Sequence, residues 1–295
     1  MKNLKYYLDK ARKEKFAIGQ FNFSDFTQVK GVVAVAQRLK SPIILGTSEG
    51  ESKFFGLEEA VGLRDALRKK TGLPIFLNLD HGKSFKYAKQ AIDAGYDMVH
   101  FDGSKLSLEE NIKITKEVKD YAKWRGVLVE GEIGTIGNDS SKLYSEKFEI
   151  KEENLTKPKE VKEYVNKTGV NLLATSFGNF HGIEASGIDP NLRLDLLEKI
   201  KEALRQAQGK TKNVFLVLHG GSGTPEDDIK EAIKIGIVKI NINTELRLAF
   251  SGNLRRVLSN NMEEITPYKY LPEAQKSVEG VVNRKIGLFG SAGKA

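Results

Sequence analysis

The stretch PIFLNLDHGKSFKYAKQAIDAGYDMVHFDGS, residues 74–104, contains a complete strand–helix–strand unit. The apolar run at 74–80 predicts a buried strand, and apolar residues at helical spacing predict an amphipathic helix at 85–94, which Gly95 ends. A second apolar run predicts another buried strand at 98–104. Nearly continuous apolar strands that alternate with helices are typical of a parallel sheet covered by helices.

This alternation extends over most of the chain. Six further strands are predicted, at 17–22, 42–48, 127–134, 171–178, 213–221 and 238–244. Seven further helices are predicted, at 26–39, 58–70, 108–124, 158–168, 192–206, 225–235 and 245–259. Eight strand–helix repeats are the number that closes an α/β fold of the (β/α)8 TIM-barrel type, for which about 250 residues is typical.

A doubly wound sheet is the alternative to the barrel. It normally carries a glycine-rich turn after its first strand, where this chain has FNFSDF at 21–26. We therefore predict a single TIM-barrel domain over residues 1–295, with a C-terminal extension at 260–295 that contains one more helix at 273–286.

Two segments of this domain are expected to be irregular. The long polar connection at 135–157 is predicted to be a mobile lid over the catalytic face. The ending GLFGSAGKA at 287–295 lacks the spacing of a P-loop and is predicted to be a flexible end.

The composition is that of a soluble globular protein, with 40% hydrophobic and 29% charged residues. No apolar run approaches the roughly 20 residues that cross a membrane, and the N-terminal stretch lacks the features of a secretory signal, so we expect a cytoplasmic protein with no membrane partner.

The absence of cysteine excludes disulfides and thiolate metal sites. The net charge of +8 indicates either a lysine-rich solvated surface or a field that attracts an anionic substrate. Nucleic acid is not an expected partner, because no basic run is interleaved with aromatic residues.

Three of the four histidines, His81, His181 and His219, are followed by glycine and lie at or just beyond the ends of predicted strands. In a barrel those ends meet on one face. Three imidazoles with one open position are the ligand set of a catalytic zinc ion, and glycine lets the backbone turn away sharply. The fourth, His100, lies inside a predicted strand, and we interpret it as a packed strand residue without a role.

Carboxylates accompany these histidines. Asp80 directly precedes His81 and is a candidate general acid or base. Asp102 and Glu132 end the fourth and fifth predicted strands, on the same rim. They are candidates to hold a second cation, to orient the histidines, or to serve as structural hydrogen-bond partners.

A phosphate site is predicted after the last two strands. HGGSG at 219–223 offers consecutive backbone N–H groups, and NINT at 241–244 offers amide and hydroxyl side chains at a helix N-terminus. In TIM barrels the loops after the seventh and eighth strands frequently bind phosphate.

Together these segments resemble the class II, metal-dependent ketose-bisphosphate aldolases, the family of the fructose- and tagatose-bisphosphate aldolases. The resemblance extends over nearly the whole chain, through GQFN (19–22), SPIILGTSEG (41–50), LDHG (79–82), DGS (102–104), VEGEIGTIG (129–137), SFGNFHG (176–182), VLHGGSG (217–223), KININTE (239–245) and FGSAGKA (289–295).

The resemblance implies reversible aldol cleavage of a ketose bisphosphate, fructose 1,6-bisphosphate first, with tagatose bisphosphate or another ketose phosphate as the alternative. It makes His81, His181 and His219 the zinc ligands, Asp80 the proton-transferring carboxylate, and Asp102 and Glu132 a second metal position. It also implies a homodimer or homotetramer. The groups that it implies for the phosphate of dihydroxyacetone phosphate and a nearby Na⁺ or K⁺ are Gly182, Gly220, Gly221, Ser222, Asn241, Ile242, Asn243 and Thr244.

The chain departs from this family in two places. Relatives carry Gly-Gly-x-Glu-Asp in the lid, whose Glu helps protonate the enediolate; here 137–141 reads GNDSS, which leaves Asp139, Glu146 and Glu149 as candidates. Relatives also carry arginines in the tail, some contacting the distal phosphate, in a neighbourhood that here holds Tyr268, Pro272 and Gln275.

Two other functions remain open from the sequence. A zinc-dependent sugar-phosphate epimerase or isomerase would use the same metal without bond cleavage, and would need a second acid or base on the opposite face of the substrate. The altered lid favours a non-catalytic phosphosugar-binding protein. Such a protein would not need the complete set of metal ligands, however, and the complete set argues against it.

Overall fold

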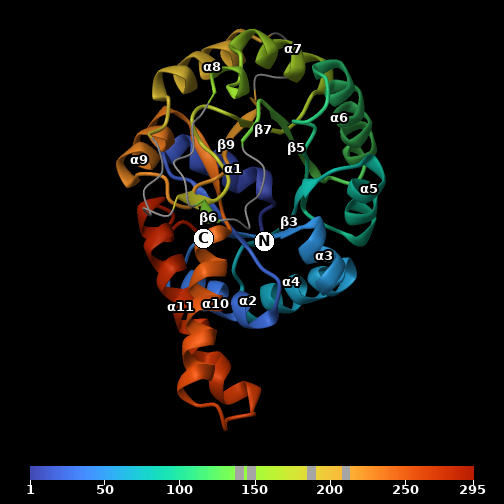
Figure 1. The fold of residues 1–295 in the computed structure, drawn as a ribbon. Coiled ribbons are helices and arrows are strands. Elements are labelled where there is room, and N and C mark those ends of the chain that lie inside the picture. The colour runs from blue at the N-terminus through green and yellow to red at the C-terminus, as the bar shows by residue number, and fades with distance from the viewer. Residues whose placement is uncertain (137–142, 145–150, 185–190, 208–212) are drawn as a thin grey trace.

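The computed structural model describes residues 1–136, 143–144, 151–184, 191–207 and 213–295. Eight parallel strands form a closed barrel in the order β1-β10-β9-β7-β5-β4-β3-β2, and helices ring it (Figure 1). Each barrel strand overlaps one of the predicted strands, so the predicted TIM barrel is confirmed. The bounds are β1 Ile18–Asn22, β2 Ile43–Ser48, β3 Ile75–Gly82, β4 Met98–Phe101, β5 Leu128–Ile133, β7 Leu172–Thr175, β9 Phe215–Leu218 and β10 Ile237–Ile242.

The predicted helices are also present, and three of them have the predicted bounds. They are α2 Phe26–Leu39, α4 Leu57–Thr71, α5 Phe85–Ala94, α6 Leu108–Lys123, α7 Pro158–Thr168, α8 Leu194–Gln206, α9 Glu226–Ile235, α10 Thr244–Asn260 and α11 Pro267–Leu288. Glycines in the left-handed region end several of them, as at the C-cap of α5, because a side chain there would be strained.

The inward-facing positions of the strands change character along the barrel axis. Near the N-terminal end they are apolar, as at Ile18, Phe76 and Met98. Because strand side chains alternate between faces, the residues two and four positions later point inward as well. These upper positions are polar and buried: Gln20, Asn22, Asn78, Asp80, His100, Glu130 and Glu132.

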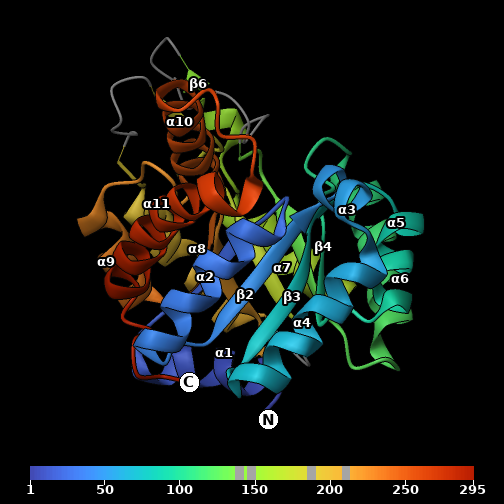
Figure 2. The ribbon, with the colours of Figure 1, turned by 90° about the horizontal axis from the view of Figure 1, so that it is seen from below.

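The N-terminal helix α1, Leu4–Glu14, was not predicted from the sequence. Its buried residues Leu4, Tyr7, Leu8 and Ala11 follow helical spacing, and they pack on the apolar inner layer of the barrel. Figure 2 shows α1 at the end of the barrel where both termini lie, opposite the end that carries β6 (Leu143–Tyr144). The helix therefore covers the N-terminal end of the barrel.

Four smaller elements were also not predicted. The helix α3, Glu49–Phe55, begins with a capping box made by Ser48 and Glu51. The strand β6 pairs in parallel with β8 (Ile183–Glu184), outside the barrel. A single 3-10 turn, η1, spans Glu152–Asn154.

The prediction of a flexible C-terminal end is wrong. The backbone N–H groups of Gly293 and Ala295 donate to the carbonyls of Leu39 and Lys40, at 2.8 and 2.9 Å. The buried Ser291 hydroxyl bonds that of Ser41 at 2.9 Å. The glycine-rich end is fixed by contacts with residues about 250 positions away, which no local sequence pattern reveals.

The last two helices form an arm. The end of α10, the turn after it and the start of α11 project away from the barrel, while the rest of α11 packs along α2 and α10 (Figure 1). Among the helices of the described residues, no apolar segment reaches the length that would span a membrane.

Candidate active site

Four histidines meet at the C-terminal end of the barrel. The Nε2 atom of His81 lies 3.1 Å from His181 Nε2 and 3.1 Å from His219 Nδ1. Three nitrogens around a tetrahedral zinc ion at about 2.0–2.1 Å would lie about 3.3 Å apart. The two distances from His81 are therefore close to those of a zinc site. Potential ligand atoms of Asp80, His81, His100 and His219 also lie within 4.8 Å of one another, as a metal site requires.

The backbone at His81 explains why a carboxylate and an imidazole are neighbours in the sequence. Asp80 points into the barrel, so the next residue of a regular strand would point outward. His81 instead has a φ of 53°, in the left-handed region that a non-glycine residue seldom adopts. The pairing of β3 with β4 also shifts register between Leu79 and Gly82. This break brings both side chains to the same pocket.

Two amide side chains hold Asp80 in place. Asn22 Nδ2 donates to Oδ2 at 2.9 Å, and Asn241 Nδ2 donates to Oδ1 at 3.0 Å. Burial alone raises the pKa of Asp80, but His81 and the other nearby histidines outweigh burial and keep the pKa well below its usual range. Asp80 is therefore an ionised carboxylate, which can accept a proton.

A pocket joins Asp80 and the histidines to the predicted phosphate site. Of the eight residues predicted to bind phosphate or a monovalent cation, Gly221 and Ile242 do not line it. The Ile242 side chain is in the core between strands and helices, and the Gly221 N–H donates to the Asn241 carbonyl at 3.2 Å. The residues that line the pocket are Asp80, His81, His181, Gly182, Gly220, Ser222, Asn241, Asn243 and Thr244.

The loop after β9 needs glycine at position 220. Gly220 has a φ of 68°, and a Cβ atom there would lie 2.0 Å from the Phe180 carbonyl oxygen. The helix α10 starts at Thr244, so its dipole favours an anion at this end. Both features suit a phosphate group.

The tail helix α11 holds this loop from behind. The buried Lys285 Nζ donates to the Gly221 carbonyl at 3.2 Å and lies 2.5 Å from Glu245 Oε1. The same Glu245 oxygen accepts from the Gly223 N–H at 3.2 Å. The C-terminal extension is thus part of the scaffold of the predicted phosphate site.

The sequence pattern of the class-II fructose-bisphosphate aldolases matches residues 2–294. The chain belongs to the class II fructose-bisphosphate aldolase family. A protein named fructose-bisphosphate aldolase from Geobacillus stearothermophilus is 36% identical over 296 residues, which cover 99% of this chain and 98% of that protein. A protein of the same name from Staphylococcus aureus strain Mu50 is 35% identical with the same coverage.

Solved structures agree with this assignment. The YdjI aldolase of Escherichia coli K12 matches with a TM-score of 0.81 and 29% identity, covering 100% of this chain and 99% of that one. The fructose-bisphosphate aldolase of Campylobacter jejuni, at 23% identity and a TM-score of 0.80, shares the fold. As a member of the family, this chain is a class II, metal-dependent aldolase, a carbon–carbon lyase.

The electrostatics of the class II aldolase site suit a metal at the three histidines. Burial lowers the pKa of His181, aided by the neighbouring rings, and lowers that of His219 to about 4, so both rings are neutral and offer lone pairs. Burial also lowers the pKa of His81, but Asp80 and Asp102 outweigh it and the net pKa is raised. A divalent ion would have to displace the proton from His81.

The two strand-end carboxylates lie beside His81, where the prediction of a second cation site needs them. Asp102 Oδ2 is 3.0 Å and Glu132 Oε2 is 3.8 Å from His81 Nδ1. Burial and then the charge of Asp102 raise the pKa of Glu132. Its buried Oε2 makes no hydrogen bond among the described residues, and its nearest basic group is His100 Nε2 at 3.3 Å. An oxygen in this condition suits a cation.

His100 is part of the aldolase cluster, which the sequence analysis did not anticipate. It is fully buried in β4, as predicted, but its Nδ1 accepts from the His81 backbone N–H at 3.1 Å. Its Nε2 lies 3.3 Å from Glu132 Oε2. Since both ring nitrogens face these groups, His100 supports His81 rather than completing the three-nitrogen set. Its position two residues before Asp102 was a signal that it shares the inner face of the barrel.

The sequence analysis also missed Glu130 and Lys239, which lie beneath His219. Glu130 Oε1 is 2.6 Å from His219 Nε2, and Glu130 Oε2 accepts from Lys239 Nζ at 2.8 Å. Burial raises the pKa of Glu130, but the Lys239 ammonium outweighs it, so the net pKa is lowered. The period-two relation of Glu130 to Glu132, and of Lys239 to Asn241, could have placed both on the inner face.

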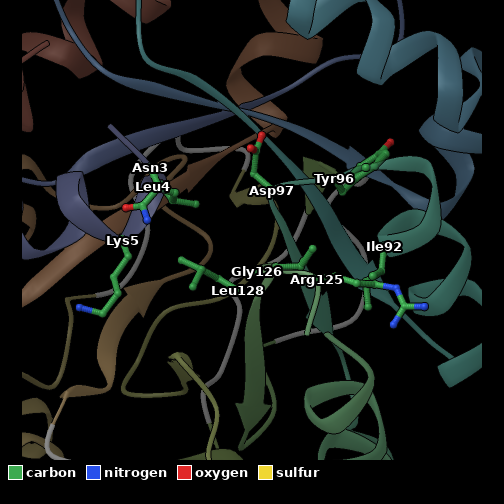
Figure 3. Close-up of a pocket in the computed structure, with 11 residues that line it drawn as sticks. Asn3, Leu4, Lys5, Ile92, Tyr96, Asp97, Arg125, Gly126 and Leu128 are labelled. Atoms are coloured by element: carbon green, nitrogen blue, oxygen red, sulfur yellow. The ribbon is translucent and has the colours of Figure 1, made fainter. Parts of the chain in front are cut away.

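Another pocket lies at the opposite, N-terminal end of the barrel (Figure 3). Asp97 in its lining is already occupied by hydrogen bonds from Arg64 and Arg68, both at 2.9 Å. Lys5 in the same lining is paired with Asp9. This pocket therefore offers no group prepared for aldolase chemistry.

Of the predicted lid, the described residues are 135–136, 143–144 and 151–157. The Ile136 carbonyl accepts from the His181 N–H, and the Thr135 N–H donates to the Asn154 carbonyl, both at 2.9 Å. The candidate proton donors Asp139, Glu146 and Glu149 lie outside the part of the chain that the structure describes.

Proposed function

We propose that this class II aldolase catalyses the reversible, zinc-dependent cleavage of fructose 1,6-bisphosphate to dihydroxyacetone phosphate and glyceraldehyde 3-phosphate. The observation that carries the proposal is that one pocket is lined by the proton acceptor Asp80, by metal-ligand histidines and by a phosphate-binding loop. The matched relatives named fructose-bisphosphate aldolase support this substrate over tagatose bisphosphate or another ketose phosphate. They also favour cleavage over epimerisation or simple binding.

The pocket would bind the substrate through its ketone-side phosphate. The loop at 220–222, Gly182 and the N-terminus of α10 would receive the phosphate oxygens. Asp80 would then accept the proton of the hydroxyl group whose carbon becomes the aldehyde. As the carbon–carbon bond breaks, its electron pair stays with the ketone fragment as an enediolate, which regains a proton to give dihydroxyacetone phosphate.

His81, His181 and His219 would hold the zinc ion, because all three supply nitrogen and the chain has no cysteine. Bound zinc supplies Lewis-acid stabilisation of the negative charge on the ketone fragment. Asp102 and Glu132 would hold a second divalent ion beside it. A Na⁺ or K⁺ ion near the phosphate would be held by the side-chain oxygens of Asn241 and Asn243, which are buried and have no partner among the described residues.

The substrate's distal phosphate is expected to contribute modestly. Tyr268, Pro272 and Gln275 stand where relatives carry arginines, and the Gln275 side-chain amide is bonded to Glu279 at 2.8 Å. We expect fructose 1,6-bisphosphate to be preferred over fructose 1-phosphate by less than about a thousandfold in kcat/KM, roughly 4 kcal/mol of transition-state binding. Steady-state assays of both sugars, with tagatose 1,6-bisphosphate in parallel, test the substrate. A preference above about a thousandfold would reveal a strong distal phosphate site. A higher kcat/KM for tagatose 1,6-bisphosphate than for fructose 1,6-bisphosphate would show that the tagatose sugar is the substrate.

The enzyme would work in the cytoplasm as a homodimer or homotetramer. The arm formed by α10 and α11 carries exposed apolar side chains at its tip: Leu258, Met262 at 86% exposure, Ile265 at 86% and Tyr268 at 75%. A cluster of this kind on a projecting hairpin favours contact with a second copy.

We expect the double substitution Met262→Glu/Ile265→Glu to split the oligomer, a homodimer into monomers or a homotetramer into smaller units, because it places two charges in the apolar contact. Sedimentation analysis measures the mass in solution. Trp124→Glu is the matched control, since Trp124 is 84% exposed at the end of α6, outside the arm. If the double variant keeps its mass, the arm is not the interface.

A further inference from the structure

A buried ion pair lies directly beneath the histidine cluster. The carboxylate of Glu130 and the ammonium of Lys239 are 2.8 Å apart, and both side chains are fully shielded from solvent. Neither side chain lines the pocket at Asp80. The pair therefore has no direct contact with a substrate in that pocket.

Stability alone does not explain this pair. Moving two charges out of water costs several kcal/mol for each ion, and an apolar pair of similar volume is often as stable or more stable. The barrel has such an apolar layer just below, at Leu128 and Val238, which neighbour Glu130 and Lys239 on the same strands. The Glu130–Lys239 pair must therefore act through the groups that it contacts.

The contact that matters is with His219. Its Nε2 lies 2.6 Å from Glu130 Oε1, while its Nδ1 lies 3.1 Å from His81 Nε2. A carboxylate can only accept, so Nε2 carries the hydrogen and Nδ1 keeps its lone pair on the side of the metal ligands. The second oxygen of Glu130 is held by Lys239, so the acceptor cannot rotate away from the ring.

The same strand links this arrangement to Asp80. Lys239 and Asn241 are two residues apart in β10, and both point inward. Asn241 Nδ2 lies 3.3 Å from His219 Nε2 and donates to Asp80 Oδ1 at 3.0 Å. Two residues of β10 thus act at both groups: Lys239 holds Glu130, the partner of His219, and Asn241 orients Asp80.

We propose that Glu130 and Lys239 are positioning residues, which set the ring orientation and tautomer of His219 for binding a divalent metal ion. This inference rests on the proposed role of His219 as a metal ligand. Partners of this kind typically contribute tenfold to a hundredfold to metal affinity.

The test compares three variants by their zinc dissociation constants, measured by competition with a chromophoric chelator. Glu130→Gln and Lys239→Met each leave one buried charge without its partner, so both are expected to lower the unfolding temperature of the metal-free protein. The double variant Glu130→Gln/Lys239→Met removes both charges and is expected to recover most of that stability. All three should bind zinc tenfold to a hundredfold more weakly than the wild type.

The double variant separates positioning from stability. Recovery of stability with zinc binding still at least tenfold weaker supports the inference, whereas wild-type zinc affinity in this variant would overturn it. Asn78→Leu is the control: Asn78 lies in the same buried polar layer and bonds Gln20, so its substitution should leave the zinc dissociation constant unchanged.

A spectroscopic readout does not depend on zinc affinity. With four histidines in the chain, ¹⁵N imidazole resonances of the zinc-loaded wild type should show the His219 hydrogen on Nε2. Finding it on Nδ1 would overturn the inference. A wild-type protein that binds no zinc would instead contradict the proposed metal dependence, so the two failures are distinguishable.

Discussion

Replacing Asp80 with alanine is expected to lower kcat by about two to four orders of magnitude while zinc remains bound, the range usual for a general acid–base group. Asp80 is the carboxylate that ends the inner face of β3, and its two oxygens already accept from Asn22 and Asn241. Its orientation is therefore fixed before substrate binds. The metal nitrogens belong to other residues, so the substitution removes the proton acceptor and leaves the ligand set complete.

Steady-state kinetics and elemental analysis of the same preparation check this prediction. Asp9→Asn is a suitable control, because Asp9 is paired with Lys5 and Arg12 on α1, at the other end of the barrel. We expect this control to match the wild type in both measurements. An Asp80→Ala protein that has lost its zinc and its fold would show that the carboxylate is structural.

Replacing His181 with alanine is expected to reduce bound zinc well below one ion per chain and to lower kcat/KM by about a thousandfold or more. The Lewis-acid contribution of a catalytic metal is worth several kcal/mol, and each 1.4 kcal/mol corresponds to a factor of ten. His181 Nε2 faces His81 Nε2 at 3.1 Å, and its ring is neutral, as a metal ligand must be.

His100→Asn is the matched comparison for this variant. An asparagine oxygen can replace His100 Nδ1 as the acceptor for the His81 backbone N–H, so zinc should stay bound. Elemental analysis after gel filtration gives the stoichiometry. If His181→Ala keeps full metal content and full activity, the assignment of His181 as a ligand is wrong.

The barrel could be predicted because its signals are local. Apolar runs, helical spacing and helix stops repeat along the chain, and three helices begin and end where the spacing predicts. The N-terminal helix was not predicted, although Leu4, Tyr7, Leu8 and Ala11 follow helical spacing, because the charged residues between them weaken the apolar pattern. The tail was misjudged for a different reason: its glycines predict flexibility, whereas distant backbone groups in Leu39 and Lys40 hold it.

Within the candidate site, the sequence predicted groups that stand at strand ends and did not predict those one layer below. Asp80, His81 and His219 were predicted because each is a polar residue that follows an apolar run. Glu130 and Lys239 are buried inside strands, where their charge contradicts the expected apolar pattern. Their roles depend on pairing across the barrel between β5 and β10, and the sequence alone does not give that distance.

The most direct test of the account is the release of triose phosphate from fructose 1,6-bisphosphate by the purified protein, before and after treatment with a chelator and again after zinc is restored. The site predicts activity in the untreated protein, loss of nearly all of it when the metal is removed, and recovery with about one equivalent of zinc per chain. Cleavage that continues unchanged in metal-free protein would contradict the assignment of His81, His181 and His219 as the centre of the reaction.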